Sequence, residues 1–228
     1  SKVAVDIFII ITGYFMVNQT FRWNKLVKLL FCTYFWGIAV LLFAMGLGLS
    51  IKTDHIYKSL FPFTPLNWFA RLYLLLYISI PIFNKLIAKV NQLQLGLINI
   101  GLITLFFTIP TLVSTFISGG GYLTSYFTFS TMYMIGAYIR KYGTVKTDTI
   151  SIGIGITCII LILGSILWND FHYYDGLYVM YLAHKGNSIV GLLAAIGIFS
   201  IFKNLKVNYS NKINVIASTT FAVYLIHN

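Results

Sequence analysis

Long apolar segments separated by short polar stretches dominate the sequence. A transmembrane helix needs about 20 mostly apolar residues, and about eight segments approach or reach that length. They run continuously, without the alternation of apolar and polar positions that a barrel strand shows. The segments are Val3–Val17, Leu26–Ser50, Leu66–Phe83, Leu93–Ile117, Thr124–Ile139, Ile150–Trp168, Ser188–Phe202 and Ile213–His227. The pattern predicts an all-α fold, a polytopic transmembrane helix bundle of about eight spanning helices, as a single domain over residues 1–228.

The basic residues gather in every second connection between these segments. The odd-numbered connections hold most of them: Arg22, Lys25, Lys28, Lys85, Lys89, Arg140, Lys141, Lys146, Lys203, Lys206 and Lys212. The even-numbered connections hold only Lys52, Lys58 and Lys185. Because loops rich in Lys and Arg stay on the cytoplasmic side, we predict cytoplasmic odd connections and an external N-terminus.

Composition supports a membrane location. Hydrophobic residues make up 58% of the chain and charged residues only 9%, whereas soluble domains are about a quarter charged. The formal net charge of +11 would suggest nucleic acid in a soluble protein. Here the cations flank apolar segments, so we interpret them as orientation signals and as contacts to anionic membrane lipids, with no nucleic-acid partner.

A few polar or charged residues lie within the apolar segments, where burying them in hydrocarbon costs free energy. Asp6 begins the first segment; at the outer interface it would be solvated, whereas inside the bundle it would need a partner. Arg71 lies inside an apolar segment with Tyr73 beyond it, and an intramembrane charge suggests function, although Arg71 could also snorkel to the surface. His227 lies deep in the last segment and could be packed or could transfer a proton.

The cytoplasmic cluster Arg22, Lys25 and Lys28 recurs every three residues, which keeps the three side chains roughly on one helical side. The cluster could set the orientation of the helix in the membrane and contact lipid headgroups. Alternatively, it could bind a polyanionic ligand such as the phosphates of a coenzyme A thioester. The longest external connection, Asn169–Asn187, carries Asp175 among aromatic residues. It is either an interfacial aromatic belt or a wall of a sugar-binding site. The histidines lack metal-ligand spacing, so we expect no metal.

Four stretches together resemble the integral-membrane acyltransferase 3 family of bacterial enzymes. They are VDIFIIITGYFMV at Val5–Val17, WFARLYLLLYISIPIFN at Trp68–Asn84, MIGAYIRKY at Met134–Tyr142 and STTFAVYLIH at Ser218–His227. Their polar members are Asp6, Gly13, Tyr14, Pro81, Gly136, Tyr224 and His227.

The resemblance implies an enzyme of the bacterial plasma membrane. It would take an acyl group, often acetyl, from cytoplasmic acyl-CoA as co-substrate and pass it to a hydroxyl of a cell-surface polysaccharide or lipid-linked glycan. The family's basic motif would map onto Arg22, Lys25 and Lys28, with two lysines where arginine is common. Asp6 and His227 would belong to the catalytic cavity, and Arg71, Tyr73 and Asp175 to the acceptor side.

The family's main catalytic histidine would lie in a helix upstream of Asp6. We therefore expect this chain to be part of a longer protein and to be inactive by itself. Two other functions fit a bundle with buried polar groups: a glycan transporter or flippase, and a non-catalytic membrane component of a polysaccharide export system. Transporters often show two related halves, and the sequence shows no such halves.

Overall fold

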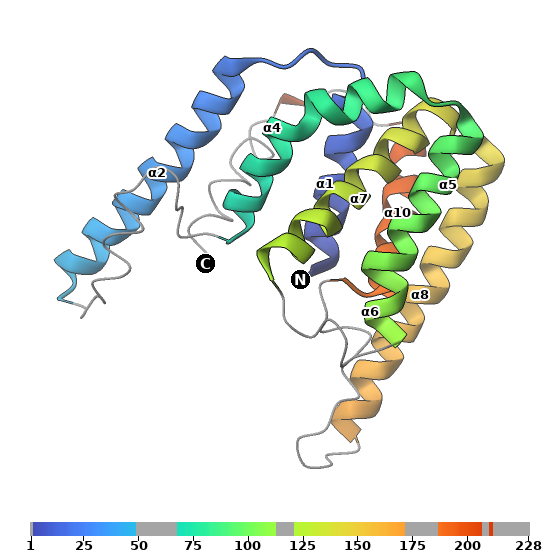
Figure 1. The fold of residues 1–228 in the computed structure, drawn as a ribbon. Coiled ribbons are helices and arrows are strands. Elements are labelled where there is room, and N and C mark those ends of the chain that lie inside the picture. Colours follow the sequence, from blue (N-terminus) through green and yellow to red (C-terminus); the bar gives the residue numbers. More distant parts are fainter. Residues whose placement is uncertain (1, 49–67, 113–120, 172–186, 207–209, 212–228) are drawn as a thin grey trace. The chain divides into compact units, whose positions relative to one another are not determined.

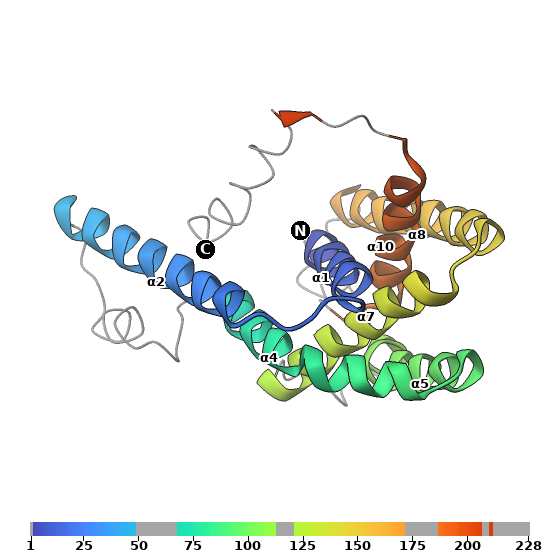
Figure 2. The same ribbon diagram turned by 90° about the horizontal axis from the view of Figure 1, so that it is seen from above.

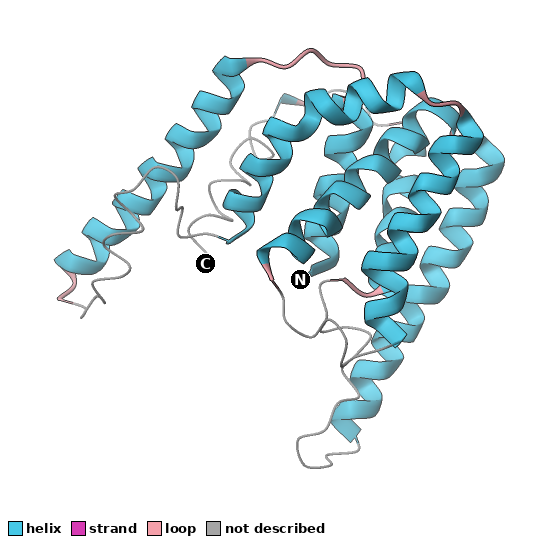
Figure 3. Cartoon of the chain, viewed as in Figure 1, coloured by secondary structure: helices cyan, strands magenta, loops and turns pink. Residues whose placement is uncertain are grey.

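The computed structural model describes residues 2–48, 68–112, 121–171, 187–206 and 210–211. Every regular element in these residues is a helix (Figure 3), which confirms the all-α prediction. The elements are α1 Lys2–Met16, α2 Trp23–Gly46, α4 Trp68–Lys89, α5 Gln92–Ile103, the π-helix η1 Thr104–Thr108, α6 Ile109–Leu112, α7 Tyr122–Tyr142, α8 Val145–Phe171 and α10 Ile189–Asn204 (Figure 1). The first seven predicted segments all correspond to helices, and the eighth, Ile213–His227, lies outside the described residues.

Several helices extend beyond their apolar segments and take in residues that the sequence pattern assigned to connections. Lys85 and Lys89 belong to α4, Arg140 and Lys141 to α7, and Lys203 to α10. The physical reason is that long basic side chains can keep their charge in water while the stem covers apolar surface. A helix therefore does not have to end where the hydrocarbon ends.

Four described helices are long and apolar enough to cross a membrane: Trp23–Gly46, Trp68–Lys89, Gln92–Leu112 and Val145–Leu167. Two shorter apolar helices, Val3–Met16 and Ile189–Asn204, accompany them. Helix α7 is long but more polar, and an unbroken run of its residues from Thr128 to Ala137 is buried. Its Thr and Ser hydroxyls bond to carbonyls one turn earlier, so a polar helix can fill the centre of an apolar bundle.

The chain divides into two compact units. Unit 1 comprises residues 1–20 and 80–205, and unit 2 comprises residues 21–79 and 206–228. Helix α4 contributes its first part to unit 2 and its last part, from Ile80, to unit 1. In unit 2, the Tyr77 hydroxyl of α4 donates to the Arg22 carbonyl at the start of α2, at 3.3 Å, and the rings of Tyr77 and Phe21 lie 5.3 Å apart.

Unit 1 is built around α7. Helix α1 packs on α7 and on α10, α8 packs on α10, and α5 packs on α7. Seen from above, α7 lies between α1 and α5, and α10 lies between α1 and α8 (Figure 2). The fully buried side chains of unit 1 include Ile9, Ile10, Leu95, Met132, Tyr133 and Leu192 of these helices and Phe107 of η1.

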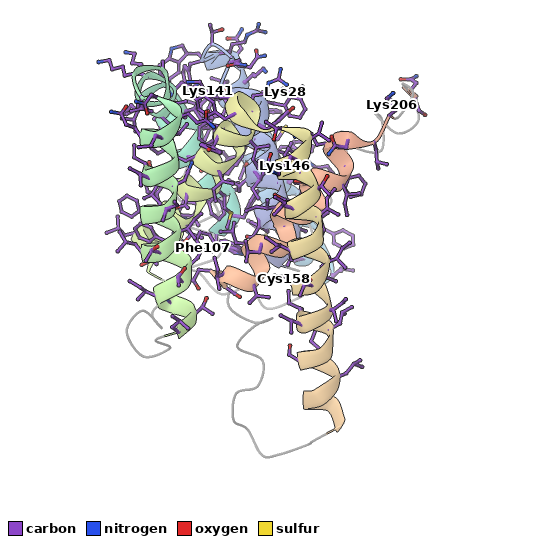
Figure 4. The ribbon with its side chains drawn as sticks, turned by 90° about the vertical axis from the view of Figure 1, so that its right-hand side faces the viewer. Lys28, Phe107, Lys141, Lys146, Cys158 and Lys206 are labelled. Atoms are coloured by element: carbon purple, nitrogen blue, oxygen red, sulfur yellow. The ribbon has the colours of Figure 1, made fainter. Side chains whose placement is uncertain are left out.

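One end of unit 1, called the basic end from here on, consists of the last turns of α1, α4, α7 and α10 and the first turns of α5 and α8. Three contacts join these turns. The Asn84 amide donates to the Met16 carbonyl, the Lys141 ammonium donates to the Ile87 carbonyl, and Lys203 pairs with Asp148. Lys141 and Lys146 lie toward this end, whereas Phe107 and Cys158 lie nearer the middle (Figure 4).

The predicted fourth segment starts at a capping box and is interrupted by a π-helical turn. Asn91 and Gln94 bond reciprocally to each other's backbone N–H groups at the start of α5, at 2.8 and 3.0 Å, which fixes that start. Further on, Pro110 has no N–H to donate, and the Ile109 N–H bonds five residues back to the Thr104 carbonyl. A π-helical turn, Thr104–Thr108, therefore leads into the turn that contains Pro110.

Helices α8 and α10 approach through small residues. A Cβ atom on Gly155 would lie 2.5 Å from the Cα of Gly197, and one on Gly197 would lie 2.9 Å from the Ser151 carbonyl oxygen. Small residues at positions 151 and 155, four apart in the chain, thus let the two helices approach closely. Gly191, near the start of α10, has no such backbone neighbour and instead lies near Asp6.

Candidate functional site

Asp6 is buried inside unit 1, with 4% of its surface exposed. The Asp6 Oδ2 lies 3.9 Å from the position that a Cβ atom on Gly191 would occupy, which places the carboxylate beside the first turn of α10. This turn is fixed by its cap: Ser188 Oγ accepts from the Gly191 N–H at 3.4 Å, and Thr111 Oγ1 accepts from the Ile189 N–H at 2.9 Å. Of the two alternatives for Asp6, the structure supports the buried one.

The first turn of a helix suits a buried carboxylate because it carries about half a positive charge. A favourable, partly buried geometry stabilises the anion by up to about 2 kcal/mol. A Cβ atom at position 191 would be in ordinary van der Waals contact with the Asp6 carboxylate. The first turn of α10 therefore offers the buried Asp6 carboxylate a favourable electrostatic neighbour.

Helices α1 and α10 run parallel, as two contacts show. Asp6 faces Gly191, and the Tyr14 ring lies 5.3 Å from the Phe199 ring; each pair has the same separation in the sequence. Asp6 and Tyr14 are eight residues apart on one stripe of α1, or about 12 Å along the axis. With Tyr14 in the last turn of α1 at the basic end, Asp6 lies about 12 Å along the helix from that end.

Arg140 is held on Tyr14 at the basic end. Its Nη1 donates to the Tyr14 hydroxyl at 3.1 Å, and its Cζ lies 4.9 Å from the centroid of the Tyr14 ring. The guanidinium remains exposed at the surface of α7. Tyr14 in turn packs edge-on against Phe199. Tyr14 therefore holds the Arg140 cation at the basic end of the face of α1 that also carries Asp6.

Asn84 joins three helices at the basic end. Its Nδ2 donates to the Met16 carbonyl at 2.9 Å, which caps the last turn of α1, and its Oδ1 accepts from the Tyr133 hydroxyl of α7 at 2.6 Å. Asn84 closes the second of the four family-like stretches, Tyr133 immediately precedes the third, and Met16 belongs to the first. The structure therefore joins the first stretch, the end of the second and the residue before the third within unit 1; the fourth, Ser218–His227, lies outside the described residues.

The predicted donor cluster belongs to unit 2. Arg22 is the N-cap residue of α2 with extended backbone, and Lys25 and Lys28 lie in the first turns of α2. All three side chains are exposed, and none forms an ion pair within the described part of the chain. The cluster is therefore accessible to an anion, and among the described residues of unit 2 no carboxylate pairs with it.

Arg71 and Tyr73, predicted on the acceptor side, lie in the first part of α4 and are half-buried. The Tyr73 ring stacks on Phe69 with centroids 5.8 Å apart. The remaining predicted residues, His227 and Asp175, lie outside the described residues, as do the other histidines. Within the described residues no three His, Cys, Asp or Glu side chains are grouped so as to hold a metal.

Sequence reasoning missed the roles of Asn84, Tyr133 and Arg140. Asn84 and Arg140 stood inside the quoted stretches, but their partners lie 49 to 126 residues away in the chain. The available signal was weak: an Asn at the end of an apolar segment and a Tyr within another. In an apolar interior such groups are expected to find hydrogen-bond partners, and the sequence alone does not identify them.

Comparison with known families gives one match. A family model described as an acyltransferase domain, acyltransferase 3, matches residues 1–228. No curated protein and no solved structure matches the chain.

Proposed function

Because this chain belongs to the acyltransferase 3 family, we propose that it transfers an acyl group, most simply acetyl, from cytoplasmic acyl-CoA to a hydroxyl of a cell-surface polysaccharide or lipid-linked glycan. Family membership makes the chain a membrane acyltransferase that moves groups other than aminoacyl groups. The match over the whole chain is the observation that carries the proposal. The donor and the glycan acceptor are our assignment.

In the proposed reaction the glycan hydroxyl oxygen attacks the thioester carbonyl carbon. The carbon–sulfur bond breaks, and the coenzyme leaves as a thiol with the proton that the hydroxyl gives up. A general base must carry that proton. We assign the base to the histidine that the family resemblance places upstream of Asp6, with His227 contributing to the same cavity.

We assign to Asp6 the task of orienting or charging a group beside it. A buried carboxylate can hold an imidazole in one tautomer and stabilise its protonated form. The position of Asp6 beside the positive end of α10 supports the proposal, because it favours the ionised carboxylate. A competing explanation is that Asp6 only fastens α1 to α10, which an amide of the same shape would test.

We assign the phosphates of the donor to Arg22, Lys25 and Lys28, and the acceptor to the side of Arg71, Tyr73 and Asp175. The exposure of the three cations supports the donor assignment. Arginine can grip a phosphate with two parallel hydrogen bonds, whereas lysine acts as a point charge. We therefore expect Arg22 to contribute most.

The test is a gene deletion in the source bacterium, with complementation by the full-length protein. Loss of surface-glycan acylation, with normal glycan export and recovery on complementation, would support the proposal. Unchanged acylation with impaired export would instead favour the transporter or export-component alternative.

A further inference from the structure

The basic end of unit 1 carries more positive charge than its own structure neutralises. In the described part of unit 1 the cations at this end are Lys85, Lys89, Arg140, Lys141, Lys146 and Lys203. The one carboxylate among them is Asp148. Both of its oxygens are taken, by Lys203 at 2.7 Å and by Asn204 at 3.1 Å. Asp148 therefore offers no counter-charge to the other cations.

Helix dipoles do not remove this excess. Four helices end at the basic end and two begin there, and each end is equivalent to about half a charge. Their sum cancels about one of the remaining five positive charges. Topology explains why basic residues gather on this side of a membrane, but it does not require any of them to be held in one position.

Arg140 differs from the other cations that are held in place, because Lys141 donates to the Ile87 carbonyl and Lys203 is neutralised by Asp148, whereas Arg140 is held by an aromatic side chain. The Tyr14 hydroxyl and ring fix the guanidinium, and Phe199 supports the ring from α10. A guanidinium has five N–H donors, and the bond to Tyr14 uses only Nη1. The exposed remainder of the fork has the geometry that binds phosphate oxygens in pairs, and a fixed side chain loses little freedom on binding.

We propose that Arg140, held on Tyr14 and flanked by Lys141, is a binding site for a phosphate-bearing anion. Two sources carry this chemistry: the phosphates of a soluble acyl donor and the headgroup of an anionic phospholipid. The site itself requires only the phosphate; its assignment to the donor rests on the proposed function. Lys146 adds to the local field without a fixed position and serves as the matched control.

The experiment uses the full-length protein in nanodiscs, with Arg140→Gln, Arg140→Lys and Lys146→Gln variants. One arm measures the Kd of acetyl-CoA by calorimetry in nanodiscs of phosphatidylcholine alone. The other arm measures phosphatidylglycerol retained by the protein, using native mass spectrometry. The Arg140→Lys variant keeps the positive charge but lacks the paired N–H donors of a guanidinium. It therefore separates the contribution of paired hydrogen bonds from that of net charge. Thermal unfolding in detergent shows whether each variant is folded.

We expect Arg140→Gln to weaken phosphate binding about tenfold or more, the usual loss when a hydrogen bond to a charged group is removed. Arg140→Lys should recover only part of the loss, and Lys146→Gln should change binding less than threefold or so. A loss confined to acetyl-CoA assigns the site to the donor, and a loss confined to phosphatidylglycerol assigns it to lipid. The proposal is overturned if neither ligand is affected, or if Lys146→Gln matches Arg140→Gln.

The two arms also separate this site from the proposed function. If the wild-type protein neither binds acetyl-CoA nor transfers an acyl group, the proposed function fails. The retention of phosphatidylglycerol still tests the Arg140 site in that case.

Discussion

Gly13 of α1 and Gly136 of α7 bring the backbones of the two helices into direct contact. A Cβ atom on Gly13 would overlap the Tyr133 carbonyl, and one on Gly136 would overlap the Ile10 carbonyl and lie 2.9 Å from the Tyr14 nitrogen. Atoms of the rigid backbone cannot give way as a flexible side chain can. This crossing therefore sets the distance between α1, which carries Asp6, and α7, which carries Arg140.

The first prediction concerns this crossing. Gly136→Ala should lower the free energy of unfolding by about 1–3 kcal/mol, because the added methyl group forces the helices apart. Thermal or denaturant unfolding in detergent measures the change. Gly153→Ala on α8 is the matched control: nothing lies within 4 Å of its Cβ position, so alanine there should stabilise the helix by about 1 kcal/mol. Equal effects of the two substitutions would contradict the crossing.

The second prediction concerns the ion pair between α8 and α10. Asp148 and Lys203 are 7% and 15% exposed, and loss of one partner from a buried pair usually costs about 3–5 kcal/mol. Lys203 can still extend toward water, so we expect Asp148→Asn to cost about 2 kcal/mol of unfolding free energy. In a double-mutant cycle with Lys203→Met, the double variant should be more stable than the sum of the single losses predicts. Strict additivity would show that the pair contributes nothing.

The apolar pattern predicted the helices of the described residues because each spanning helix needs a long apolar segment. It also predicted that basic residues gather near helix ends, since a charge is costly in hydrocarbon; the cytoplasmic location of those ends stays a prediction. It did not predict that Asn84 would join Met16 to Tyr133, or that Arg140 would lie on Tyr14. Those contacts depend on how helices far apart in the chain pack together, and one sequence carries no direct record of that packing.

Asp6 illustrates the same limit within the candidate site. Its position at the start of an apolar segment left open whether it faced water or the bundle interior. Only the packing of α10 against α1 decides this, because it places the first turn of α10 beside the carboxylate. Arg22, Lys25 and Lys28 were easier to judge, because three cations at one helix end are exposed whatever the packing.

The third prediction tests Asp6 as a functional group. In the full-length protein, Asp6→Asn should lower the rate of acyl transfer by about 10²–10⁴-fold, the range typical of lost acid–base assistance. The amide has nearly the same shape, so a merely structural Asp6 would show as reduced stability with kcat largely retained. We would measure kcat and KM for acetyl-CoA together with thermal unfolding. Wild-type kcat in a folded Asp6→Asn variant would exclude the assignment.

The fourth prediction tests the donor cluster in unit 2. Arg22→Ala and Lys25→Ala should each raise the Kd of acetyl-CoA in the full-length protein, with the larger effect, about tenfold, for Arg22. Raising the salt concentration should shrink both effects, because exposed charges are screened. Asn24→Ala, between the two cations and also exposed, is the matched control and should leave the Kd unchanged. Unaltered affinity in both cation variants would remove the cluster from the donor site.

The last prediction tests the orientation of the bundle by cysteine labelling. Lys85 and Arg140 both lie at the basic end of unit 1, whereas Gly121 precedes the other end of α7. Nineteen residues separate Gly121 from Arg140, or about 28 Å of helix, close to the thickness of the hydrocarbon layer. After Cys32 and Cys158 are replaced by serine, single cysteines at positions 85 and 140 should react with a membrane-impermeant maleimide only in opened cells. A cysteine at position 121 should react in intact cells.

Labelling of positions 85 and 140 from opposite sides would contradict both the topology and the packing of α4 on α7. The Lys141 ammonium bonds to the Ile87 carbonyl, so the ends of the two helices must lie at the same surface.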